Sequence, residues 1–178
     1  MHVTLVMVET ADGKTTSWHE PEIHGWSSKE DQEHFRSLLA SHTLLVMGRK
    51  TYEGVKNQIQ LSRNLRRIVL TQRPEDYKER IVDGQLEFSD ESPEELVTRL
   101  ENEGYNDMIL VGGSEVNESF LSSHLLHECY ITIEPKFFGS GKPLFAPTNV
   151  DISLQLMEMK RLNDQGTVLL RYTILYED

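Results

Sequence analysis

The sequence predicts an α/β domain built on a mainly parallel sheet that ends in an antiparallel hairpin. Its length of 178 residues suits one domain with its own core. Short apolar runs alternate with helical patterns along most of the chain, as in parallel sheets covered by helices. The turn sequence Asn163-Asp164-Gln165-Gly166 separates two final strand patterns. We therefore expect residues 1–178 to form a single domain.

The first half begins with a buried strand and continues with a capped helix. Ser27 or Ser28 can cap the helix, and Phe35, Leu38 and Leu39 recur at helical spacing. The expected elements are a strand at 3–8, a helix at 28–40, a strand at 43–47, a short helix from 51 and a strand at 67–71.

The second half continues the alternation. Ser92, Pro93 and two glutamates form a typical helix start, and Gly104 ends that helix. The expected elements are a helix at 92–102, a strand at 108–111, a helix at 114–121, and strands at 128–134, 153–160 and 167–176.

The net charge of −11 argues against nucleic acids and anionic membranes as general partners. Residues 49–73 break this trend, with seven basic residues and one acid, so this window carries +6 and the remainder −17. A local positive field in an acidic chain favours a small polyanionic ligand. The alternative is a solvated face without a ligand.

The single cysteine, Cys129, lies in an apolar strand pattern and is expected to be a buried thiol in a reducing compartment. The N-terminus lacks a basic signal region, and no apolar run approaches eighteen residues. We therefore expect a cytoplasmic protein without a membrane span. His124 and His127 have no partner at metal-ligand spacing, so no metal site is predicted.

Two strand-to-helix turns are the main functional features. Residues 44–51 read LLVMGRKT, and residues 108–115 read MILVGGSE. Such a turn directs unpaired N–H groups at one point and can seat a phosphate, although either one alone could be a plain tight connection. The GxGxxG and P-loop spacings are absent. Two such turns on one sheet favour a dinucleotide.

These turns carry a family resemblance. Residues 47–53 (MGRKTYE) resemble the MGRxTxES turn of the dihydrofolate reductase superfamily, which includes the reductase domain of riboflavin-biosynthesis enzymes. Residues 111–116 (VGGSEV), 130–132 (YIT) and 141–145 (GKPLF) resemble that superfamily's later motifs, in the same order. The resemblance implies a three-layer fold with a central, mainly parallel mixed sheet and flanking helices.

The resemblance also implies NADPH as cofactor. Gly48, Arg49, Lys50 and Thr51 would hold the pyrophosphate and the 2′-phosphate, with Thr71 and Arg73 near the latter. The other side of the pyrophosphate would lie on Gly112, Gly113, Ser114, Glu115 and Val116, with a cis peptide between the two glycines.

On the substrate side, the resemblance implies that Asp31, Trp26 and Thr132 act in catalysis, with Thr132 hydrogen-bonded to the Asp31 carboxylate. Asp31 and Phe35 are four residues apart and share a helix face. A carboxylate on an apolar wall can accept paired ring N–H groups and help to direct a proton. From the residues alone, a first-turn helix acid favoured by the helix dipole is the preferred interpretation of Asp31. The expected substrate-binding residues are Val6, Val8, Phe35, Arg63, Arg66 and Val111.

Three functions remain open. The 47–53 turn and the spacing from Trp26 to Asp31 favour reduction of dihydrofolate to tetrahydrofolate. The alternative is reduction of 5-amino-6-(5-phosphoribosylamino)uracil in riboflavin biosynthesis, with Arg63, Arg66 or Arg67 at the substrate phosphate. Leu65 stands where folate enzymes carry their tail arginine. The third reading is a non-catalytic nucleotide-binding protein. In each case we expect a monomer or homodimer acting on a small molecule.

Overall fold

The computed structural model describes residues 1–17 and 25–176. The strands are β1 (His2–Thr10), β2 (Leu44–Gly48), β3 (Arg66–Leu70), β4 (Leu86–Ser89), β5 (Asp107–Leu110), β6 (Glu128–Glu134), β7 (Ser153–Arg161) and β8 (Val168–Leu175). The helices are α1 (Lys29–Ser41), α2 (Arg49–Val55), the 3₁₀-helix η1 (Pro74–Arg80), α3 (Pro93–Asn102) and α4 (Ser114–Ser122).

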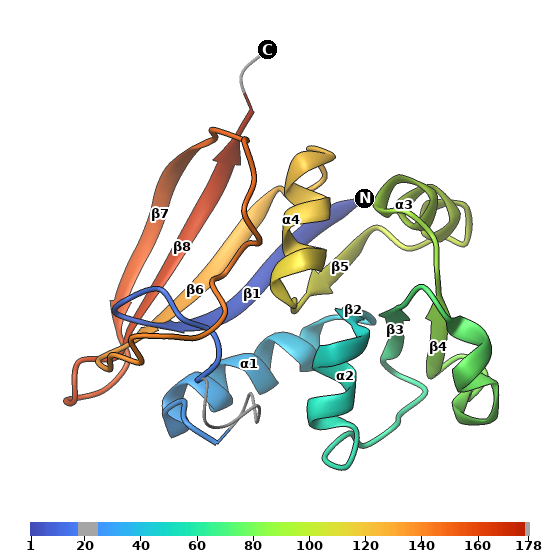
Figure 1. The fold of residues 1–178 in the computed structure, drawn as a ribbon, viewed down its shortest axis with the longest axis horizontal. Coiled ribbons are helices and arrows are strands. Elements are labelled where there is room, and N and C mark those ends of the chain that lie inside the picture. The colour runs from blue at the N-terminus through green and yellow to red at the C-terminus, as the bar shows by residue number, and fades with distance from the viewer. Residues whose placement is uncertain (18–24, 177–178) are drawn as a thin grey trace.

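The strands form one sheet in the order β4-β3-β2-β5-β1-β6-β8-β7 (Figure 1). The strands from β4 to β6 are parallel to one another, whereas β8 runs antiparallel to both β6 and β7. The sequence prediction of a mainly parallel sheet with an antiparallel C-terminal hairpin is therefore confirmed.

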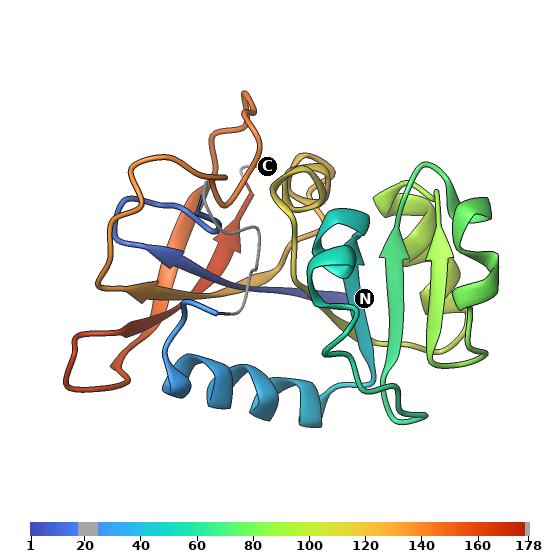
Figure 2. The same ribbon diagram turned by 60° about the horizontal axis from the view of Figure 1, so that its bottom comes forward.

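Helices cover both faces of this sheet and make three layers. On one face, α1 and α2 pack over a core that includes Leu45, Met47 and Val69. Figure 2 shows α1 running below the sheet. On the other face, α3 and α4 pack over a second core around Leu100, Leu110 and Phe120. Parallel strands in the middle of the sheet are apolar on both faces because each face meets a helix.

Two elements were absent from the sequence prediction. The edge strand β4 has only four residues, of which Leu86 and Phe88 are buried, so its pattern is too short to stand out. The 3₁₀-helix η1 has no buried residue and therefore no periodic apolar stripe. The helix α2 begins at Arg49 rather than Thr51, directly after its N-cap Gly48.

Cys129 is buried in β6, and burial raises the pKa of its thiol to about 12. Its expected place in the core is thus confirmed. Within the described part of the chain, no helix has the length and apolar character needed to cross a membrane. The same residues contain no group of three or more His, Cys, Asp or Glu arranged to hold a metal ion.

Candidate active site

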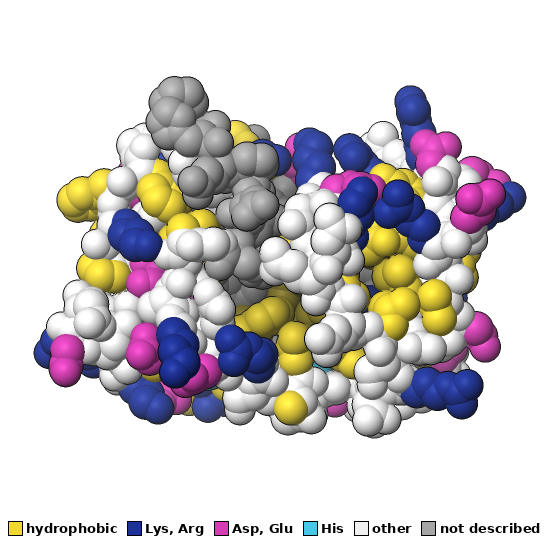
Figure 3. Space-filling model, turned by 90° about the horizontal axis from the view of Figure 1, so that it is seen from below, with side chains coloured by type: hydrophobic (Ala, Val, Ile, Leu, Met, Phe, Trp, Pro, Cys, Tyr) yellow, Lys and Arg dark blue, Asp and Glu magenta, His cyan; other side chains and the backbone are white. Residues whose placement is uncertain are grey.

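A large open cleft of about 2000 Å³ passes the carboxyl ends of β2, β3 and β5 and continues to His42 and Leu65, beside the amino ends of β2 and β3. It extends from Asp31 and Phe35 on α1 to Arg73 after β3. Seen from below, hydrophobic side chains are exposed across the middle of this face, and several Lys and Arg side chains gather beside them (Figure 3). Ligands of open α/β sheets bind at this edge, so the cleft is the candidate active site.

The two glycine turns touch each other in the wall of this cleft. The Gly48 N–H donates to the Gly112 carbonyl oxygen at 2.7 Å. The peptide between Gly112 and Gly113 is cis, as the family resemblance implies. Neither α2 nor α4 has a side-chain hydrogen bond at its N-cap, so first-turn N–H groups of both helices remain open to the cleft.

Glycine is required at position 48 by the packing of the turns. A Cβ atom there would lie 2.9 Å from Val116 Cγ2 and 3.5 Å from the Gly112 oxygen. We expect Gly48→Ala to lower stability by about 1–3 kcal/mol, because the added methyl overpacks this contact. Adding Val116→Ala should recover most of the loss, measured by denaturant unfolding. Gly25→Ala is the control, because no atom of the non-adjacent residues that the structure describes lies within 4 Å of its Cβ position. Equal losses at positions 25 and 48 would contradict the packing argument.

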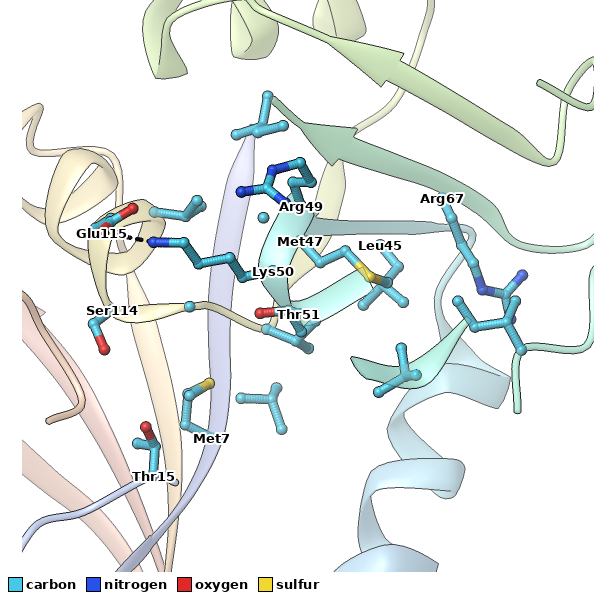
Figure 4. A pocket seen from close by; sticks show the side chains of 18 of the residues that line it. Met7, Thr15, Leu45, Met47, Arg49, Lys50, Thr51, Arg67, Ser114 and Glu115 are labelled. Carbon is cyan, nitrogen blue, oxygen red and sulfur yellow. Dashed lines mark hydrogen bonds and ion pairs between the residues drawn. The ribbon is translucent and has the colours of Figure 1, made fainter. Parts of the chain in front are cut away.

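The basic window divides into paired and unpaired cations. Lys50 pairs with Glu115 at 3.3 Å across the two turns (Figure 4). Lys56 pairs with Glu53, and Arg66 pairs with both Glu87 and Glu103. Among the described residues, no ion pair is formed by Arg49, Arg63, Arg67 or Arg73. The cleft is lined by three of these four arginines, Arg49, Arg67 and Arg73. The uncompensated positive charge of the basic window is therefore concentrated in the cleft.

Asp31 lies at the other end of the cleft, in the first turn of α1. Its N–H donates to the side chain of the N-cap Ser28 at 3.3 Å, so the cap predicted from the sequence is present. Only 9% of Asp31 is exposed, and burial raises the pKa of its carboxyl, although hydrogen bonds from Thr132 and Ser27 oppose this shift. A carboxyl in this setting can hold a proton nearer neutral pH than an exposed aspartate can.

Most of the sequence-predicted site residues come together in the cleft. Beside Asp31 and Phe35, the lining includes Val6, Val8, Gly48, Arg49, Lys50, Thr51, Thr71, Arg73, Val111, Gly113, Ser114, Glu115 and Val116.

Five predicted residues do not line it. Trp26 is 7% exposed and stacks edge-on against Phe138, while Thr132 lies behind Asp31 as its hydrogen-bond donor. Gly112 is buried under the turn. Arg63 is exposed outside the cleft, and the ion pairs of Arg66 hold its guanidinium away from it.

Arg67 lines the cleft, and the sequence named it only as one of three arginines that could meet a substrate phosphate. It is 8% exposed, and its Nη1 donates to the Leu65 carbonyl oxygen at 3.3 Å. In Figure 4, Met47 and Leu45 lie between Arg67 and the two basic residues Arg49 and Lys50. Arg67 is therefore apart from the glycine turns. Since a guanidinium has five N–H donors, a buried and unpaired one is a strong candidate to bind an anion. The alternation of β3 places adjacent Arg66 and Arg67 on opposite faces of the sheet, but it does not say which of the two faces the cleft.

Comparisons with known proteins agree with this geometry. The model of the RibD C-terminal domain family matches residues 1–168. Among curated proteins, the uncharacterized protein YwjB of Bacillus subtilis is 29% identical over 119 residues, which are 66% of this chain and 66% of that protein. The matched segment is thus just under two thirds of the relative's own length.

Solved structures share the fold at low sequence identity. A pyrimidine reductase-like protein from Corynebacterium diphtheriae superposes with a TM-score of 0.81 at 12% identity, over 99% of this chain and 92% of that one. Dihydrofolate reductase from Enterococcus faecalis, complexed with NADP(H), gives a TM-score of 0.67 at 21% identity, over 97% of this chain and 96% of that one. The fold implied by the resemblance is therefore confirmed.

Proposed function

Because the chain belongs to the RibD C-terminal domain family, we propose that it is an NADPH-dependent reductase of a small substrate that contains a nitrogen heterocycle and an anionic arm. The observation that carries this proposal is one continuous cleft joining the glycine turns to a buried, partly desolvated carboxylate. Neither the glycine turns nor the carboxylate would support a reductase alone. Glycine turns also occur as plain strand–helix connections, and first-turn acids also occur as residues that stabilise a helix end.

The residues at the glycine turns fit NADPH. A Cβ atom at Gly48 would fill the space between the two turns, and one at Gly113 would lie 3.6 Å from Thr51 Oγ1. Arg49 and Arg73 would meet the 2′-phosphate, with Gly113, Ser114 and Thr51 at the pyrophosphate. When bound, NADPH supplies the hydride.

Arg49 gives a direct test of the cofactor. We expect Arg49→Ala to raise the Michaelis constant for NADPH about tenfold and to change that for NADH far less, because only NADPH carries the 2′-phosphate. Steady-state kinetics with both cofactors measures the difference. The control is Arg63→Ala, an exposed cation outside the cleft, which should alter neither constant. Equal losses for both cofactors in Arg49→Ala would remove the 2′-phosphate role.

On the substrate side, Asp31 would accept two adjacent ring N–H groups. Phe35, one helical turn further along α1, would lie against the ring face, and Val6, Val8 and Val111 would form the apolar wall. With its raised pKa, the Asp31 carboxyl would help to deliver a proton to the ring nitrogen next to the reduced carbon. The pterin of dihydrofolate offers such adjacent N–H donors, so dihydrofolate is the first candidate substrate.

A second candidate is 5-amino-6-(5-phosphoribosylamino)uracil. Its ring N1–H and 6-amino N–H are also adjacent donors, and its phosphate would suit Arg67. The buried Leu65 at the position of the folate-tail arginine favours this candidate.

The deciding experiment is NADPH oxidation with each substrate separately, followed by absorbance and with product identification. Turnover with one substrate at a rate well above the NADPH background assigns the function. Tight NADPH binding without acceleration by either substrate would reject the reductase and leave a nucleotide-binding protein.

A further inference from the structure

Glu134, at the end of β6, is a buried carboxylate that the reductase chemistry described above does not use. It is 2% exposed, and no ion pair is formed by it among the described residues. Its Oε1 accepts the Ser28 N–H at 2.6 Å, and its Oε2 accepts the Thr167 hydroxyl at 2.8 Å. A buried, unpaired acid is costly to keep in a protein interior, so its retention calls for a role.

Both hydrogen bonds connect Glu134 to the surroundings of Asp31. Ser28 is the N-cap of α1 and accepts the Asp31 N–H, so Glu134 holds the residue that caps the first turn. Thr167 also accepts from Asn163 Nδ2 at 2.9 Å, and Asn163 donates to Glu30 at 3.1 Å. The turn between β7 and β8 thereby lies against the N-terminal end of α1 (Figure 2).

The same residue acts on Asp31 through its charge. Thr132, two residues before Glu134 on the same face of β6, donates to the Asp31 carboxylate. After burial, the Glu134 charge is a further cause of the raised Asp31 pKa. Within the described part of the chain, His34 also acts on Asp31 through its charge; burial lowers the pKa of His34, and Lys160 and Glu158 of β7 act on it in turn.

We infer that Glu134 is a positioning residue for Asp31: it fixes the first turn of α1 through Ser28, and its negative charge disfavours ionisation of the neighbouring Asp31 carboxyl. The contribution of Glu134 to catalysis rests on the proposed function. Its effect on the position and titration of Asp31 does not. A Glu134 that merely fills space would hold the fold without altering how Asp31 titrates.

The test follows the Asp31 carboxyl directly, by ¹³C NMR of the ligand-free protein across pH, with the signal assigned by its loss in Asp31→Asn. In Glu134→Gln, the amide oxygen can accept the Ser28 N–H while its NH₂ group donates to Thr167, so the charge is removed with little change of shape. We expect the Asp31 titration midpoint to move to lower pH in this variant. Glu134→Asp, which keeps the charge, should titrate closer to the wild type.

The matched control is Glu30→Gln, which also removes one negative charge. Glu30 precedes Asp31 in the chain, but its carboxylate accepts a hydrogen bond from Asn163. Its Asp31 midpoint should stay at the wild-type value. If Glu134→Gln does not fold, Glu134→Met removes the charge with an unbranched apolar chain and should move the midpoint in the same direction. An unmoved midpoint in the folded charge-removing variant, or an equal movement in Glu30→Gln, would overturn the inference.

Activity provides the second readout. Because a lower Asp31 pKa leaves less of the protonated form at neutral pH, turnover of Glu134→Gln at pH 7 should fall about 3- to 10-fold and recover as the pH is lowered. If the midpoint moves but no substrate accelerates NADPH oxidation in the wild type, the proposed function fails and the positioning role stands.

Discussion

Asp31→Asn is expected to lower turnover at neutral pH by roughly 10²-fold or more, the scale of lost general acid–base help. NADPH affinity should barely change, because the glycine turns lie at the other end of the cleft. Turnover should recover in part at low pH, where a substrate protonated in solution bypasses the missing carboxyl. Glu33→Gln, on the exposed face of α1, is the control and should turn over like the wild type. Wild-type turnover across pH in folded Asp31→Asn would defeat the assignment.

The pH dependence of unfolding stability separates a catalytic role of Asp31 from a role as a helix-stabilising acid. Burial raises the pKa of Asp31 above its ordinary value of 3.8, so the folded state holds this proton more tightly than the unfolded state. Stability is therefore lost as the pH rises from about that value through the raised pKa. Asp31→Asn should be at least as stable as the wild type at pH 7, and the difference should shrink toward pH 3.8 in thermal unfolding. A first-turn acid that only stabilises the helix predicts lower stability at pH 7 instead.

Arg67→Met is expected to raise the Michaelis constant for an anionic substrate by about 10- to 100-fold, the equivalent of one or two lost charge-assisted hydrogen bonds. The constant for NADPH should not change, since Arg67 lies away from the glycine turns. The free energy of unfolding should stay the same or rise, because burial lowers the pKa of this unpaired guanidinium and the variant removes the cost of burying its charge.

Arg66→Met is the matched control, one residue earlier on the same strand. Its guanidinium pairs with Glu87 and Glu103, so its loss should lower stability by about 1–3 kcal/mol while leaving both Michaelis constants near the wild-type values. If Arg66→Met raises the Michaelis constant for the anionic substrate and Arg67→Met instead lowers stability, the assignment of Arg67 as the anion-binding side chain is wrong.

Local signals in the sequence predicted most of the fold. The N-cap of α1 and the capping box from Ser92 to Glu95 are formed within a few residues, so the sequence alone indicates them, although it left Ser27 and Ser28 open as the cap of α1. The strand β4 could not be predicted in this way. Its pairing with β3 depends on residues from Arg67 to Leu70, so only the assembled sheet defines it.

The same distinction applies to the site. The sequence located the glycine turns, and the resemblance gave Asp31 as a candidate site residue with Thr132 as the partner of its carboxyl. It could not decide among the neighbouring arginines, because a shift of one residue in the pairing of Arg67 with Leu45 would reverse which of them faces the cleft. Glu134 escaped notice since its partners, Ser28 and Thr167, lie far from it in the chain.

The burial of Cys129 makes the natural chain ready for site-specific labelling. Its thiol is the only one in the sequence, and with a pKa of about 12 almost none of it is the reactive thiolate at neutral pH. Maleimide dyes should therefore leave the folded protein unmodified. A cysteine introduced at the exposed Gln58, which lines the cleft and has no assigned role, would then carry a fluorophore alone, and its emission would report ligand binding in the cleft without removal of any native residue from the core.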